Sequence, residues 1–126
     1  MIIVDDNSDV NSLLSGIFTL KGFKVYKTFG AEECLRKLTE LDGKIDVVTI
    51  DGKIAADRGA MLIVKIKKIN PTIKIIAAAD DESDKTRILD YGADSFITKP
   101  LSLETIADKV VNTLLKEKRL EDTLSK

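Results

Sequence analysis

Short apolar runs alternate with amphipathic stretches along the chain, and this alternation constrains the fold more than any other feature. The runs are rich in β-branched residues, as strands are, and the stretches repeat apolar residues at helical spacing. We expect strands at residues 2–4, 24–28, 45–50, 73–79 and 94–98. We expect a first helix that Asn7 or Ser8 caps and Gly22 ends, then helices at residues 31–41, 59–69, 81–91 and 102–119. Strict alternation of this kind predicts an α/β fold, with a parallel sheet covered by helices on both faces.

The chain has no histidine and a single cysteine, which removes several classes of chemistry. Ser-His-Asp triads, HExxH zinc sites and histidine-based acid–base catalysis are excluded, and the chain cannot itself carry a phosphohistidine. Cys34 cannot form a disulfide within the chain or a zinc cluster. Its place on the apolar side of the expected helix at 31–41 predicts a small buried core residue. Chemistry must therefore come from carboxylates, lysines, hydroxyls or the backbone.

Length and charge are those of an ordinary globular domain. The 126 residues are enough for one hydrophobic core and too few for two. The formal net charge is −1 and the lysines and arginines form no polybasic run, so we expect no direct nucleic-acid partner. The apolar runs are far shorter than a membrane span, and the N-terminus lacks the features of a signal peptide. We therefore expect a cytoplasmic protein with no membrane partner.

Charged side chains stand where several of the expected strands end. Asp5 and Asp6 follow the first strand, Asp51 follows the third, and Lys99 follows the fifth. In a parallel sheet the functional crevice lies beyond the carboxyl ends of the strands. If the first strand is central, three carboxylates and one ammonium group meet at one edge of the sheet.

Such a group of charges has a functional and a bland interpretation. Three neighbouring carboxylates favour a hard divalent cation, Mg²⁺ or Mn²⁺ in its place, and a carboxylate there can act as a nucleophile toward phosphorus. Lys99 would then neutralise a bound phosphoryl group. In the bland interpretation Asp5 and Asp6 point into water because the strand has ended, and Asp51 begins an ordinary Asp-Gly turn. The residues alone leave both interpretations open.

The combined spacing resembles the receiver domain of two-component response regulators. The resemblance rests on Asp5-Asp6, Asp51, Lys99-Pro100 and the stretch GADSFITKP (92–100), with GAEECL (30–35) and Gly59 in support. It covers residues 1–118 and leaves 119–126 as a helix extension or a tail. It implies a single flavodoxin-like (βα)5 domain whose strand order is 2-1-3-4-5.

The resemblance also implies roles for individual residues. Asp51 would accept a phosphoryl group from the phosphohistidine of a histidine kinase or phosphotransfer protein. Lys99 would contact that group, next to a Pro100 peptide that is cis in the family, and Phe96 would be the aromatic switch residue. The implied Mg²⁺ ligands are the carboxylates of Asp5, Asp6 and Asp51 and the backbone carbonyl of Lys53. A downstream protein would bind the face formed by residues 81–91, 94–98 and 102–119, where we expect exposed apolar side chains.

Two positions depart from the family pattern. Ala55 stands where the family usually has proline, in what we expect to be a loop between Asp51 and Gly59, so that loop should be less constrained. The fourth strand lacks the usual Thr or Ser near its end. Counting forward from Gly59 puts Ala79 at this position and counting back from Lys99 puts Ala77 there; we take Ala79. Without that hydroxyl, we expect the response of Phe96 to phosphate to be weak.

Two other functions are compatible with these residues. A pseudo-receiver would keep the fold and signal without phosphate, although four clustered charges with no ligand would be costly. A Mg²⁺-dependent aspartyl-phosphate phosphatase would need a carboxylate two residues after the nucleophile, and Lys53 stands there. We therefore expect a signalling module and not an enzyme.

Overall fold

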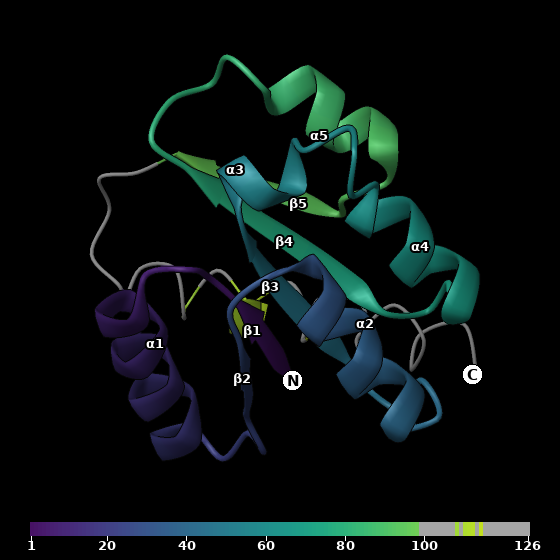
Figure 1. Cartoon of the computed structure of the whole chain (residues 1–126). Helices are drawn as coiled ribbons and strands as arrows, with labels where there is room; N and C mark the ends of the chain where they lie inside the picture. The colour runs from purple at the N-terminus through teal and green to yellow at the C-terminus, as the bar shows by residue number, and fades with distance from the viewer. Residues whose placement is uncertain (99–107, 109, 113, 115–126) are drawn as a thin grey trace, which may run out of the picture.

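The computed structural model describes residues 1–98, 108, 110–112 and 114 (Figure 1). Lys99 and Pro100, most of the helix expected at 102–119, and the extension at 119–126 lie outside the described residues.

Five parallel strands form one sheet in the order β2-β1-β3-β4-β5, which confirms the predicted α/β fold and strand order. The strands are β1 (Ile2–Val4), β2 (Tyr26–Thr28), β3 (Val47–Asp51), β4 (Lys74–Ala79) and β5 (Ser95–Thr98). The sheet extends to both sides of β1, because β1 pairs with β2 along one edge and with β3 along the other. The carboxyl end of β1 therefore lies inside the sheet and not at its border.

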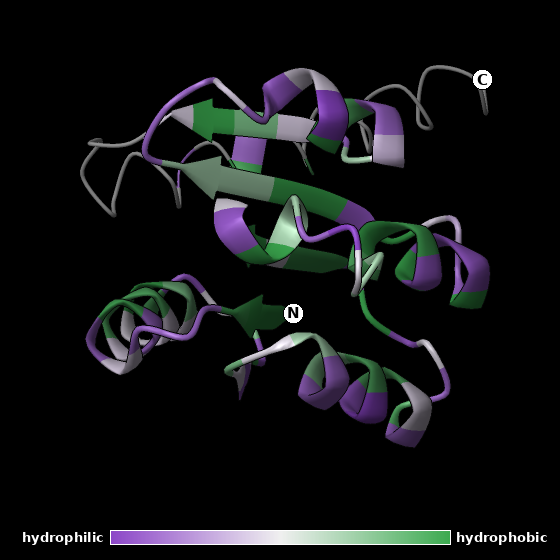
Figure 2. Cartoon of the chain, turned by 45° about the horizontal axis from the view of Figure 1, so that its top comes forward, coloured by the Kyte–Doolittle hydropathy of each residue, from purple (hydrophilic) through white to green (hydrophobic). Residues whose placement is uncertain are grey.

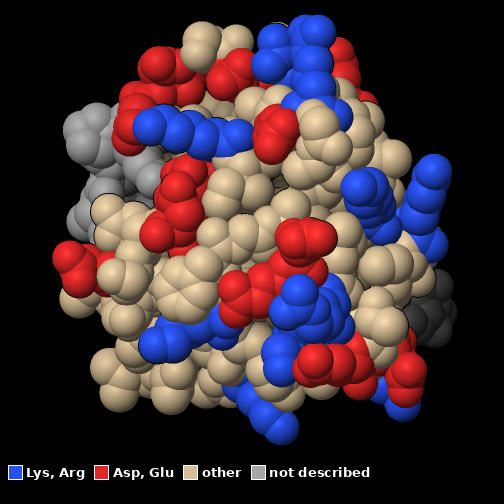
Figure 3. Space-filling view, viewed as in Figure 1, with Lys and Arg blue, Asp and Glu red and all other residues tan. Residues whose placement is uncertain are grey.

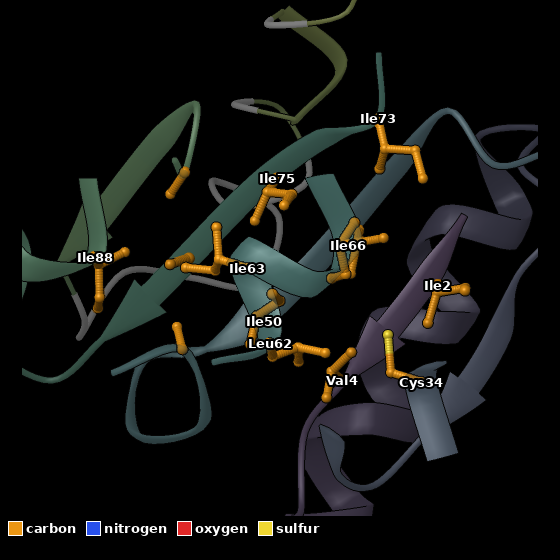
Figure 4. Close-up of a cluster of buried hydrophobic side chains, with 14 of the residues drawn as sticks. Ile2, Val4, Cys34, Ile50, Leu62, Ile63, Ile66, Ile73, Ile75 and Ile88 are labelled. Atoms are coloured by element: carbon orange, nitrogen blue, oxygen red, sulfur yellow. The ribbon is translucent and has the colours of Figure 1, made fainter. Parts of the chain in front are cut away.

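Helices cover both faces of the sheet (Figure 1). They are α1 (Ser8–Leu20), α2 (Ala31–Glu40), α3 (Gly52–Ala55), α4 (Leu62–Ile69) and α5 (Lys85–Tyr91). One buried cluster joins one face of the sheet to α2, α3, α4 and α5, and it includes the isoleucines labelled in Figure 4. A second cluster joins the other face to α1 and to Val110. Figure 2 shows the apolar strands between helices whose outer surfaces are hydrophilic. No helix in the described part of the chain is long and apolar enough to span a bilayer.

Helix α1 starts as predicted, and packing decides which of its apolar side chains are buried. The Asn7 side chain accepts hydrogen bonds from the N–H groups of Asp9 and Val10, which caps the helix. The buried residues are Asn11, Leu14 and Phe18, whereas Leu13, which fits the apolar pattern equally well, is 59% exposed. Helix spacing alone does not decide between neighbouring apolar stripes.

The segment after Asp51 is helical at its start, so the expectation of a loop is wrong there. Residues 52–55 form α3, and Ala55 is buried in the core between the sheet and the helices. The next helix, expected from 59, begins only at Leu62. Met61 precedes it in a left-handed conformation, with φ 46°. The packing of Ala55 holds the chain close to the sheet immediately after β3.

The amino ends of β4 and β5 are tied together by Asp94. Its N–H donates to the Ile75 carbonyl, and its carboxylate accepts a hydrogen bond of 2.8 Å from the Ile75 N–H. The Lys67 ammonium of α4 lies 2.9 Å from the same carboxylate and donates to the Ile73 carbonyl at 2.7 Å. One helix and two strands are thus joined at the edge of the sheet opposite to the strand ends that carry Asp51.

Cys34 is fully buried on α2, as the sequence predicted (Figure 4). Burial raises the pKa of its thiol to about 12. The thiolate is the reactive form of cysteine, so the native side chain is both covered and protonated at neutral pH.

We therefore expect a thiol reagent at pH 8 to label Cys34 at least about 100-fold more slowly in the native protein than in the denatured chain. The reaction is slow because it requires local opening of the native structure around Cys34. The measurement is the rate of thionitrobenzoate release from 5,5′-dithiobis(2-nitrobenzoic acid). A Cys34→Ala/Ser12→Cys variant, with its thiol on the exposed side of α1, is the fast control. Equal rates for the two proteins would contradict this account of Cys34.

Candidate functional site

Asp5 and Asp51 meet at the carboxyl edge of the sheet. β1 and β3 are in register from Ile2 opposite Val48 to Val4 opposite Ile50, so the next residue of each strand is Asp5 and Asp51. Both line one cavity of about 20 Å³. Asp5 is only 5% exposed and Asp51 is partly exposed. The structure therefore brings together two of the three carboxylates that the sequence singled out.

The loop that carries Asp5 is held by a buried asparagine that the sequence analysis missed. Asn11 is fully buried, and its Nδ2 donates to the carbonyls of Asp5 (3.1 Å) and Thr28 (2.8 Å). The Asp5 carboxylate accepts a hydrogen bond from the Asn7 N–H at 2.9 Å, and the Asp5 N–H donates to the Thr28 carbonyl. A polar residue on the buried side of α1 was the signal in the sequence. It fixes the backbone at the point where the acidic residues begin.

Asp6 and Lys53 lie beside this pair but are more open to solvent. Asp6 and the Lys53 side chain are exposed, and Lys53 lies in α3 two residues after Asp51. Within the described ranges, no three Asp, Glu or Cys side chains are grouped as ligands of one metal ion. Lys99 lies outside the described residues.

The donor set nevertheless fits a magnesium ion. Mg²⁺ keeps several of its waters and is usually bound by one or two carboxylates and not by a complete protein cage. Asp5 and Asp51 supply two carboxylates next to a solvent-accessible edge. Oxygen donors of this kind are also what Mn²⁺ accepts, whereas zinc prefers nitrogen and sulfur donors.

The start of α3 rests directly on the end of β4. A Cβ atom added to Gly52 would lie 2.3 Å from the Cβ and 2.9 Å from the Cα of Ala79, so no side chain fits at Gly52. Gly52 is buried, and Ala79 is the last residue of β4. The glycine after Asp51 is thus required by close packing. From the sequence alone, this Asp-Gly pair indicates only a possible turn.

The register of β4 places its two candidate alanines differently. Asp51 pairs with Ala78, so Ala79 stands one residue closer to the carboxyl edge, whereas Ala77 pairs with Ile50. On its other side Ala77 pairs with Phe96 of β5, and Ala79 pairs with Thr98. Phe96 is partly buried and packs against the core cluster below α4 and α5. Ala79 is therefore the nearer of the two to Asp51's end of the sheet.

Comparison with known proteins agrees with this arrangement. The family model of the response regulator receiver domain matches residues 1–111. The chain belongs to this family. A cyclic di-GMP phosphodiesterase of Thermotoga maritima is 29% identical over 90% of this chain, and the aerobic respiration control protein ArcA of Escherichia coli K12 is 28% identical over 90% of it. The receiver domain spans 30% of the first relative's length and 48% of the second's.

Solved structures agree on the fold. One chain in the crystal structure of the CheX-CheY-BeF3-Mg²⁺ complex from Borrelia burgdorferi is 27% identical to this receiver domain, with a TM-score of 0.76. The match covers 90% of this receiver domain and 87% of that chain. Receiver domains are signalling modules of two-component systems and not typical enzymes. The expected family and fold are confirmed.

Within the described part of this receiver domain, the large exposed apolar side chains lie mainly outside residues 81–98. In residues 81–98 the one large exposed apolar side chain is Leu89, at 39% exposure, whereas α1 carries Leu13 at 59% and Leu20 at 90%. Within residues 81–98 the expectation is met only at Leu89, and most of the 102–119 part of the expected face lies outside the described residues. The surface shown in Figure 3 carries Lys and Arg side chains interspersed with Asp and Glu.

We expect Gly52→Ala to destabilise the receiver domain by about 1–3 kcal/mol, because an added methyl group must displace α3 from β4. The free energy of unfolding from a urea titration is the measurement. Gly16 is the matched control, since it is exposed in α1 and an added Cβ would meet nothing within 4 Å. Gly16→Ala should stabilise by about 0.5–1 kcal/mol, as alanine does in a helix interior. If the free energy of unfolding of Gly52→Ala equals that of the wild type, α3 does not rest on β4.

Proposed function

We propose that this receiver domain accepts a phosphoryl group on Asp51 from the phosphohistidine of a histidine kinase or a phosphotransfer protein. The observation that carries the proposal is the position of Asp51, which is partly exposed and shares a cavity with the buried Asp5 at the carboxyl edge of β3. An Asp51 oxygen forms the new bond to phosphorus while the phosphorus–nitrogen bond of the donor breaks. The neutral imidazole of the donor leaves, and Asp51 becomes an acyl phosphate.

Asp5, Asp6, Asp51 and the Lys53 carbonyl would hold a Mg²⁺ ion at this edge, with Mn²⁺ able to replace it. When bound, the ion neutralises the charge that crowds around the transferring phosphoryl group. The Mg²⁺ in the Borrelia CheY complex supports this assignment. Lys99 would complete the charge balance on the far side of the phosphoryl group.

The response to phosphate is proposed to be weak, because Ala79 has no hydroxyl to bind the phosphoryl group. A ligand shifts a two-state equilibrium only through contacts that differ between the states. A hydrogen bond to a charged group is worth roughly 1.5–3 kcal/mol, so its loss reduces the population shift by about 10- to 100-fold. Phe96, packed against the core, would then turn little when Asp51 is modified.

We propose that this domain acts in the cytoplasm and that its partners are proteins. The donor is a histidine kinase or phosphotransfer protein, and a downstream protein binds the face that includes α5 and β5. The exposed Leu13 and Leu20 make α1 a second surface that a protein partner could cover. Nucleic acid is not a proposed direct partner, given the net charge of −1.

A pseudo-receiver that signals without phosphate is the second candidate. The exposure of Asp6, one of the proposed metal ligands, favours it. The two candidates differ in one measurable property, the modification of Asp51.

We expect the intact mass to increase by one phosphoryl group when the protein is incubated with acetyl phosphate and Mg²⁺, and not when the ion is chelated. Asp51→Asn should abolish the increase, because an amide oxygen is a poor nucleophile. Asp90→Asn, which removes a carboxylate from exposed α5, is the matched control and should be modified normally. A wild-type mass that stays unchanged under saturating donor would favour the pseudo-receiver.

We expect Ala79→Ser to enlarge the response of Phe96 and of the α5 amides to beryllofluoride. Serine adds one heavy atom to the alanine side chain, which is the smallest change that supplies a hydroxyl. NMR chemical shifts with and without beryllofluoride, in wild type and variant, provide the measurement. Ala77→Ser tests the alternative register. A full response in wild type that Ala79→Ser does not increase would contradict the proposed role of Ala79.

A further inference from the structure

The cavity beside Asp51 is almost entirely apolar. It lies at the carboxyl edge between the sheet and the first turns of α1, and its volume is about 20 Å³. Its polar side chains are those of Asp5, Asp51 and Thr49, and the other side chains that line it are aliphatic. No motif in the sequence assigns a role to Thr49.

The hydroxyl of Thr49 is buried without a partner. Thr49 is 7% exposed, and its Oγ1 forms no hydrogen bond with any described residue. Its neighbours across the sheet are Ile3 on β1 and Ile76 on β4, so neither adjoining strand offers a polar side chain beside it. Burying a hydroxyl without a hydrogen bond is unfavourable, and such groups in native proteins usually have an ordered water.

The cavity has the size and the polar groups that one water molecule needs. A buried water requires at least about 10–15 Å³ and two to four polar partners. Thr49 and Asp51 are alternate residues of β3 and so lie on the same face, about 6.6 Å apart along the strand. Two hydrogen bonds of about 2.8 Å through one water join oxygen atoms up to about 5.6 Å apart, so the two side chains need to close only about 1 Å of this separation. The volume of about 20 Å³ holds one such water.

We propose that this cavity holds a water molecule that joins the Thr49 hydroxyl to the Asp51 carboxylate. Thr49 is then a positioning residue, which acts on the phosphoacceptor through the water and does not touch the phosphoryl group. The bridge holds the inner side of the carboxylate and leaves its outer oxygen toward the edge where the donor arrives. The role of the water in phosphorylation rests on the proposed function, whereas its presence does not.

A dry cavity and a wet one predict opposite effects of Thr49→Val, which keeps the side-chain shape and removes the hydroxyl. If the cavity is dry, valine removes an unpaired buried hydroxyl, so the melting temperature rises. If the water is present, valine removes one of its anchors, so the melting temperature falls. Thr49→Ser retains the hydroxyl and should keep the water.

The test is a high-resolution crystal structure of the wild type, Thr49→Ser and Thr49→Val, with the melting temperature of each. We expect a water within hydrogen-bond distance of Thr49 Oγ1 and the Asp51 carboxylate in the first two proteins and not in the third. An empty cavity in the wild type, or a higher melting temperature in Thr49→Val, overturns the proposal.

The positioning role is tested by the initial rate of Mg²⁺-dependent modification by acetyl phosphate. We expect Thr49→Val to slow it roughly two- to tenfold, the factor that one neutral hydrogen bond is worth, and Thr49→Ser to restore it. Thr39→Val is the matched control, since it removes a hydroxyl that bonds the Leu35 carbonyl on α2, and neither residue lines the cavity. Unchanged modification of Thr49→Val overturns the positioning role. If acetyl phosphate never modifies the wild-type protein, the proposed function is contradicted. The crystal structures still decide whether the cavity holds the water.

Discussion

The pairing of β1 with strands on both of its sides is the constraint on which the rest of the structure depends. The strand has three residues, all of them buried, and parallel neighbours on each side can be reached only through crossover helices. The connection through α1 covers one face of the sheet and the connection through α2 covers the other. Because β1 is so short, the first polar residues of the chain arrive at the inner part of the carboxyl edge, next to the end of β3.

Burial of Asp5 at that edge requires its polar groups to be satisfied locally. The Asn7 N–H donates a hydrogen bond to the Asp5 carboxylate, and the Asn11 side chain donates to the Asp5 carbonyl. The Asp5 N–H donates to the Thr28 carbonyl. Asn7 also caps α1, so the start of the helix and the position of the carboxylate are set by one short segment. The acidic loop is therefore fixed by the fold itself.

Much of the architecture could be predicted from the sequence, because the alternation of strands and helices is strong and Asn7 and Gly22 mark the ends of α1. The burial of Cys34 followed from helical spacing in the same way. The preference for Phe18 over Leu13 could not be predicted, since both fit the period and only tertiary packing separates them. α3 was missed because its four residues are too few to show a period, and its helical form depends on contact with β4.

Some features of the candidate site could be predicted from the sequence and others could not. The pairing of Asp5 with Asp51 follows from the strand order, which was implied by the resemblance to receiver domains and not by the pattern of residues alone. The roles of Asn11 and Thr49 do not follow from any local pattern, because each depends on what lies across the sheet or the helix interface. A buried polar residue in an apolar run indicates that a partner exists, and only coordinates identify the partner.

The contact between Gly52 and Ala79 has a consequence for how sequences of this kind can change over time. Each residue occupies space that the other would need for a larger side chain, so the fitness of a substitution at one position depends on the residue at the other. A side chain at 52 becomes acceptable only after α3 has shifted away from β4, and the same shift opens the space for a larger residue at 79. Related receivers in which these two positions differ from Gly and Ala should therefore have changed both, and the two columns of an alignment should covary.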